Sequence, residues 1–130
     1  MLKQLTVMVA LTTAANVGMG TKEGQRIKRQ AVDATRSAAA TYEVHLMARE
    51  LHRAQINDRV PSRWDFGRFI EEEFHSYEPD RELSLDPWGH PYRLEATGEH
   101  YVVACDGPDG LAYSDDDIEA KVPIRDFLYR

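Results

Sequence analysis

Several residue types and motifs that mark a particular chemistry are scarce or missing in this chain of 130 residues. The single cysteine, Cys105, excludes an intramolecular disulfide and a cysteine-rich zinc site, and we expect it to be a buried, unreactive thiol. The five histidines have no HExxH or similar spacing, so we expect surface histidines rather than a metal site. No glycine-rich phosphate loop and no Gly-x-Ser-x-Gly motif occurs. The sequence therefore predicts a protein that is not an enzyme.

Basic residues are also fewer than acidic ones. The chain has 16 Lys and Arg against 22 Asp and Glu, a formal net charge of −6 at pH 7, which argues against nucleic-acid binding. Residues 21–60 carry eight basic and five acidic groups, whereas residues 61–130 carry seven basic and 17 acidic ones. Six acidic residues and no Lys or Arg fall between Asp106 and Glu119. Such a stretch is either a cation site or a solvated loop.

Charge is nearly absent from residues 1–21, where Lys3 stands alone. An 18-residue helix over residues 4–21 would span about 27 Å, close to the hydrocarbon thickness of a bilayer. A cleaved signal peptide, a retained anchor and a buried helix are three open interpretations, of which we favour an anchor or the start of a longer helix. Basic residues directly after the segment would, by the positive-inside rule, keep the remaining chain cytoplasmic. The apolar side chains expected to face a membrane or an assembly are Leu5, Val7, Val9, Leu11 and Val17.

Residues 22–57 contain no proline, and apolar side chains recur there every three or four residues. This spacing predicts one long amphipathic helix, with charged residues such as Glu43 away from the apolar face. Two helices broken near Gly20 to Gly24 are the alternative. The positions expected on the apolar face are Ile27, Ala31, Ala34, Ala38, Ala40, Val44, Met47, Leu51 and Ala54.

A short amphipathic helix over residues 62–75 is expected after Pro61, which ends the long helix, because Ser62 followed by Asp65 resembles a capping box. The C-terminal region, residues 85–118, is typical of antiparallel strands over Tyr92–Ala96 and His100–Cys105, joined by a hairpin turn. The turn before these strands contains Asp86, Pro87, Trp88 and Gly89. We expect its tryptophan to pack the sheet against the long helix.

Three motifs follow one another in this region: Asp86-Pro87-Trp88-Gly89-His90-Pro91-Tyr92, then Asp106-Gly107-Pro108-Asp109-Gly110, then Asp116-Asp117-Ile118. In order and spacing, behind a long helix, they resemble the C-terminal half of the major pseudopilin of type II secretion systems, a type IV pilin-like family. That family reads Asp-Pro-Trp-Gly-Asn-Pro-Tyr, a strand pair, a Gly-Ala-Asp-Gly turn and a terminal acidic stretch. The resemblance covers residues 85–118, about a quarter of the chain.

The resemblance implies an α+β, pilin-like fold in which a long N-terminal helix packs on a small antiparallel sheet with a C-terminal acidic loop. Residues 22–130 would form the globular domain. The implied function is a structural subunit of a membrane-associated secretion or pilus assembly, whose partners are other pilin-like subunits. The implied location is the bacterial inner membrane, reached through the apolar N-terminal segment, with a periplasmic C-terminal domain.

The resemblance also implies a calcium ion that orders the acidic loop. By position, Asp109 and Asp117 would supply carboxylate ligands, Asp115 or Ser114 would assist, and the backbone carbonyl of Asp106 would complete the shell. Calcium takes six to eight oxygen ligands and tolerates irregular geometry, which suits such a loop. A loop held by turns and water alone is the alternative.

The N-terminus departs from the family pattern. The family has a leader that ends in glycine, followed by Phe-Thr-Leu-Ile-Glu, whereas Met1-Leu2-Lys3-Gln4-Leu5 stands here. The glutamate that helps family subunits join the filament has no counterpart in this stretch. An alternative function is therefore a membrane-tethered accessory subunit with a pilin-like fold, which docks on another membrane complex without polymerising.

Overall fold

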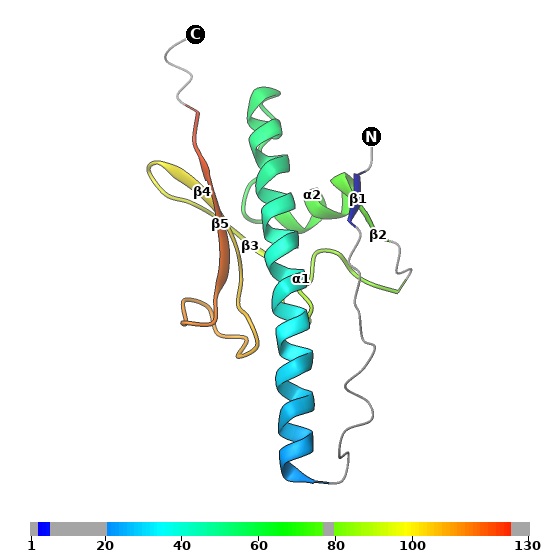
Figure 1. Cartoon of the computed structure of the whole chain (residues 1–130). Coiled ribbons are helices and arrows are strands. Elements are labelled where there is room, and N and C mark those ends of the chain that lie inside the picture. Colours follow the sequence, from blue (N-terminus) through cyan, green and yellow to red (C-terminus); the bar gives the residue numbers. More distant parts are fainter. Residues whose placement is uncertain (1–2, 6–20, 77–79, 126–130) are drawn as a thin grey trace.

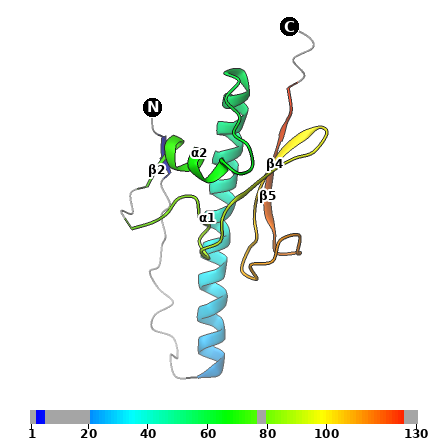
Figure 2. The same cartoon turned by 180° about the vertical axis from the view of Figure 1, so that it is seen from behind.

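The computed structural model of this protein describes residues 3–5, 21–76 and 80–125. Its fold is organised around helix α1 (Lys22–Ile56). A three-stranded antiparallel sheet lies on one side of this helix and helix α2 (Phe66–Glu73) on the other (Figures 1 and 2). The expected α+β class, a long helix packed on a small antiparallel sheet, is confirmed.

The ends of α1 follow from local chemistry. Thr21 is the N-cap, and its side-chain oxygen accepts a hydrogen bond from the N–H of Gly24 at 3.0 Å. At the other end, Asp58 has a φ of 55°, a left-handed conformation that stops the helix after Asn57. Between these ends α1 is continuous, so the single long helix expected over residues 22–57 is confirmed, and Gly24 does not interrupt it.

The sheet contains β3 (Arg93–Ala96), β4 (His100–Cys105) and β5 (Ile118–Pro123), in that spatial order. The first two strands and their hairpin match the expectation to within one residue. The third strand was not expected, because the predicted β region ended at residue 118. It could have been recognised from the alternation of apolar and charged residues: Ala120 and Val122 are buried, whereas Glu119 and Lys121 are exposed.

The core lies where the C-terminal half of α1 meets β4, β5 and α2. A buried amide joins the end of the helix to the end of the sheet: Gln55 Nε2 donates to the carbonyl of Pro123 at 3.1 Å. Gln55 Oε1 accepts from the N–H of Arg125 at 2.8 Å. The largest apolar side chains that are fully buried are Phe66, Met47, Leu51, Ile70, Val44 and Val103.

Helix α2 is shorter than the helix expected over residues 62–75. Ser62 and Asp65 do form the predicted capping contacts, because Ser62 Oγ accepts from the N–H of Asp65 at 3.2 Å and donates to its Oδ2 at 3.0 Å. These contacts hold a turn, and the helix begins after it, at Phe66. Its other end is also earlier, because Phe74 adopts an extended conformation and opens strand β2 (Phe74–Ser76).

The N-terminal segment differs from expectation where the structure describes it. Leu5, expected in an apolar helix, lies in strand β1 (Lys3–Leu5), which pairs in parallel with β2. The physical reason is that pairing with β2 supplies ladder hydrogen bonds to backbone groups that a helix would satisfy internally. Within the described residues, no helix is long and apolar enough to cross a membrane. The other expected apolar positions, Val7, Val9, Leu11 and Val17, lie outside the described residues.

Candidate functional site

The acidic loop joins β4 to β5, and its two ends lie side by side. Cys105 and Ile118 are partners in the strand pairing, so Asp106 and Asp117 stand at opposite ends of the loop. The loop then folds tightly: Gly107 has a φ of 72°, and a Cβ there would clash with the backbone of Asp116. Two carboxylates at the base of one loop repel each other unless a cation lies between them.

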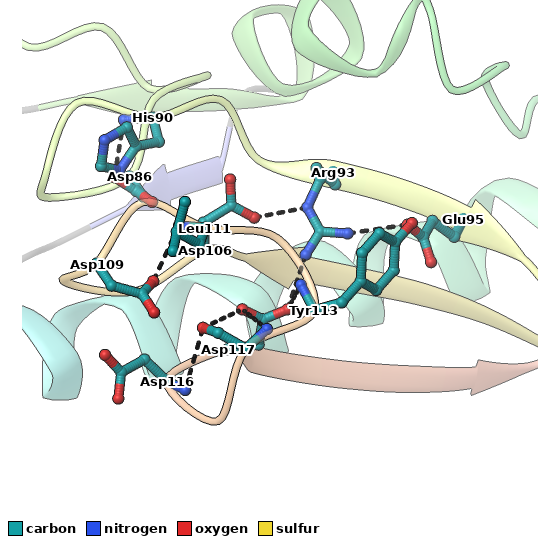
Figure 3. A network of polar contacts seen from close by, with 11 residues as sticks. Asp86, His90, Arg93, Glu95, Asp106, Asp109, Leu111, Tyr113, Asp116 and Asp117 are labelled. Carbon is teal, nitrogen blue, oxygen red and sulfur yellow. Dashed lines mark hydrogen bonds and ion pairs between the residues drawn. The ribbon is translucent and has the colours of Figure 1, made fainter.

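Arg93 on β3 supplies that positive charge. Its Nε donates to Asp106 Oδ1 at 2.7 Å, and its Nη2 donates to Asp117 Oδ2 at 3.0 Å. Its Nη1 donates to Glu95 Oε1 at 2.9 Å. Figure 3 shows the guanidinium between these carboxylates, with the ring of Tyr113 beside it. We call Arg93, Glu95, Asp106, Tyr113 and Asp117 the Arg93 cluster.

The remaining contacts of the Arg93 cluster close it from the loop side. The guanidinium carbon of Arg93 lies 4.9 Å from the centre of the Tyr113 ring, a cation–π distance. The hydroxyl of Tyr113 donates to Glu95, which raises the pKa of Tyr113. Partial burial by itself would lower the pKa of Arg93, but the hydrogen bond to Asp106 and the three carboxylate charges outweigh it and raise that pKa.

The predicted calcium ligands divide into two groups. Asp106 and Asp117 come together, on Arg93. Asp109 instead folds back on its own loop, where Oδ1 accepts from the N–H of Leu111 at 2.9 Å. That hydrogen bond, followed by the hydroxyl of Ser114, lowers the pKa of Asp109. Asp115 is exposed.

The part of the chain that the structure describes holds no group of three His, Cys, Asp or Glu side chains arranged to bind a metal ion. Where the predicted ligands do converge, at Asp106 and Asp117, the donors around them are N–H groups and hydroxyls. This donor set fits a guanidinium and does not fit calcium, which needs converging oxygen atoms. Calcium binding by this chain stays a prediction.

The turn Asp86-Pro87-Trp88-Gly89 connects the sheet side of the molecule to α1. Asp86 is buried, and its Oδ1 accepts from the N–H groups of Trp88 and His90, both at 2.9 Å. The indole Nε1 of Trp88 donates to Asp33 Oδ1 on α1 at 3.2 Å, and its ring packs against the core. Trp88, expected to pack the sheet against the long helix, thus contacts α1 and the core. Gly89 has a φ of 88°, which favours glycine at this position.

A second polar cluster lies inside the core. Glu43, expected away from the apolar face of α1, is fully buried and forms an ion pair with Arg81. It also accepts a hydrogen bond from the hydroxyl of Tyr92. Burial raises the pKa of Glu43 and that of Tyr92, although Arg81 acts in the opposite direction on both. Helical periodicity does not reveal that Glu43 is buried, because the residues that pair with it, Arg81 and Tyr92, lie 38 and 49 positions further along the chain.

Cys105 and two of the histidines lie where the sequence predicted them. Cys105 is fully buried, and burial raises the pKa of its thiol to about 11, which keeps it protonated and unreactive near neutral pH. His45 and His52 are exposed on α1.

The sequence interpretation missed Arg93. Its signal was available, because Arg93 is the only Lys or Arg between Arg81 and Lys121, a stretch rich in Asp and Glu.

Comparison of this chain with protein-family models, with curated proteins and with solved structures gave no match in any of the three cases.

Proposed function

We propose that this protein is a non-enzymatic, pilin-like structural subunit of a membrane-associated secretion or pilus assembly. The observation that carries the proposal is the unequal packing of α1. The C-terminal half of the helix is buried against β4 and β5, while residues 22–39 contain no buried side chain. The N-terminal end of α1 extends beyond the sheet in Figure 1. A helix of this kind can pack on neighbouring subunits without disturbing the domain that carries it.

The order of elements supports the same proposal. A long helix precedes a short helix and an antiparallel sheet, and the Asp86–Gly89 turn is fixed to the helix through Trp88 and Asp33. The resemblance rested on three sequence motifs behind a long helix, and it implies a long N-terminal helix followed by a small antiparallel sheet. Under the proposal, the partners are other pilin-like subunits, and the location is the bacterial inner membrane with a periplasmic C-terminal domain. The membrane contact would come from the apolar residues 6–20.

A second function is favoured by two features of the N-terminus. Lys3–Leu5 pairs with β2 and does not extend α1, and the stretch lacks the glutamate of the family pattern. Both features suit a membrane-tethered accessory subunit that docks on another membrane complex without polymerising. The two functions differ in the partner of the exposed half of α1: copies of similar subunits in the first case, a foreign protein in the second.

Cysteine cross-linking distinguishes the two functions, because the single native cysteine is buried. We would produce the full chain with Arg29→Cys in the exposed half of α1, and treat membranes of the producing bacterium with a short bismaleimide. A matched control is Glu119→Cys, which is exposed on β5. A ladder of multimers from Arg29→Cys alone is the expected result. One larger band containing a different protein would favour the accessory subunit, and monomer alone would contradict both.

A further inference from the structure

The base of the acidic loop already contains a cation that belongs to the chain. We propose that the guanidinium of Arg93 orders this loop in place of the calcium ion that the family resemblance implies. The inference concerns how the loop is held and does not depend on the proposed function. The resemblance implies oxygen ligands that converge on calcium, whereas the structure has Arg93 among three carboxylates.

Asp117, one of the two predicted carboxylate ligands, has both oxygens engaged by donors. Its Oδ2 accepts from Arg93 Nη2 at 3.0 Å and from the N–H of Tyr113 at 2.8 Å. Its Oδ1 accepts from the N–H and the hydroxyl of Ser114, both at 3.3 Å. A calcium ion would have to displace these donors in order to reach either oxygen at 2.3–2.6 Å.

The geometry of the cation matches its surroundings. A guanidinium is a planar fork with several N–H groups, and here its three nitrogens reach three different carboxylates, Glu95, Asp106 and Asp117. The ring of Tyr113 packs on it, so the loop itself contributes to the contact. The charge of Arg93 offsets part of the attraction that these three carboxylates would exert on a divalent ion.

The placement of Arg93 explains why one side chain is sufficient. Arg93 lies on β3, whose neighbour β4 leads into the loop at Asp106. Asp117 leads out of the loop into β5. One arginine on the first strand therefore joins both ends of the connection between the other two strands. An arginine side chain stays charged at all physiological pH values, so the loop is held without dependence on a soluble ion.

The first test is the response of the unmodified full chain to metal. Thermal unfolding would be followed with calcium, with magnesium and with excess chelator. A ligand that binds only the folded state raises the unfolding midpoint. We expect the same midpoint in all three conditions. A rise of several degrees with calcium but not with magnesium would overturn the proposal, whatever the behaviour of any variant.

The second test removes the cation. Arg93→Ala is compared with Arg68→Ala, which removes one positive charge from an exposed position on α2. We expect the unfolding midpoint of Arg93→Ala alone to fall by about 4 °C or more. Amide hydrogen exchange of Tyr113 and Ser114 should become faster in this variant, while the amides of β4 keep their protection. Equal midpoints and equal loop exchange in the two variants would overturn the proposal.

A variant that keeps the positive charge provides a second test in case Arg93→Ala does not fold. Arg93→Lys retains a positive charge but loses the planar fork that reaches three carboxylates. We expect faster exchange of the Tyr113 and Ser114 amides with β4 still protected. Loop exchange identical to that of the unmodified chain would contradict the role assigned to the guanidinium.

Discussion

The two halves of α1 share one continuous helix and one apolar period, yet their surroundings are opposite. Leu51 in the C-terminal half is fully buried, whereas Ile27 in the N-terminal half is 50% exposed. The predicted apolar positions Ala31, Ala34 and Ala38 are exposed as well. Periodicity therefore identifies which side of a helix is apolar. It does not identify which part of the helix's length is covered by other elements.

The difference between the halves comes from the other elements. The sheet and α2 lie beside the C-terminal half of α1 (Figure 2). The exposed half is maintained by its own sequence, with strong helix formers, the Thr21 cap and an ion pair between Glu23 and Arg26 at 3.7 Å. The packed half builds the core, whereas residues 22–39 contribute the contact of Asp33 with Trp88 but no buried side chain. This difference is the basis of the proposed function.

The largest effect is expected where the packed half carries a buried charge. Glu43→Ala leaves Arg81 without its buried partner, so we expect a loss of about 3–5 kcal/mol in the free energy of unfolding. Urea denaturation provides the measurement, with Arg49→Ala, an exposed position on the same helix, as the control. The comparison fails if the two variants lose similar stability. Adding Arg81→Ala to Glu43→Ala should cost less than Arg81→Ala alone.

A matched pair of apolar truncations compares the two halves directly. Leu51→Ala should lower the free energy of unfolding by about 2–5 kcal/mol, because it opens a cavity in the core. Ile27→Ala should change it by no more than about 0.5 kcal/mol, because half of that side chain already faces solvent. Chemical denaturation of both variants checks the prediction. Equal losses would mean that the N-terminal half is packed in solution.

A smaller loss than that of Leu51→Ala is expected at the contact between the Asp86–Gly89 turn and α1. Trp88→Phe keeps an aromatic ring but removes the hydrogen bond to Asp33, which should cost about 0.5–1.5 kcal/mol of unfolding free energy. The measurement is a double-mutant cycle with Asp33→Ala. If Trp88 and Asp33 interact, the double variant loses less unfolding free energy than the two single variants together. Strictly additive losses would contradict the contact.

Much of the fold could be predicted from the sequence because its signals are local. The long helix follows from the absence of proline and the spacing of apolar residues, and the β3–β4 hairpin follows from strand residues around a Gly98 turn. Strand β5 was missed although Ile118–Pro123 alternates apolar and charged positions. The start of α2 was misjudged because the Ser62–Asp65 contacts suit a turn as well as a cap.

The candidate site was predicted only in part. The density of carboxylates indicated either a cation site or a solvated loop, and in the structure Asp106 and Asp117 meet on Arg93. The identity of the cation was beyond local reasoning, because Arg93 is 13 and 24 residues from these partners. Calcium and guanidinium satisfy the same sequence pattern, since both neutralise converging carboxylates.

The sequence by itself indicated what depends on neighbours in the chain: a long helix over residues 22–57, the turn at Asp86–Gly89 and the hairpin of β3 and β4. Only the tertiary structure decided which half of α1 is covered, which carboxylate is buried with Arg81, and which side chain lies between Asp106 and Asp117. The physical reason is the range of the interactions. Helix and turn hydrogen bonds join residues a few positions apart, whereas burial and ion pairing depend on segments that meet only after the chain has folded.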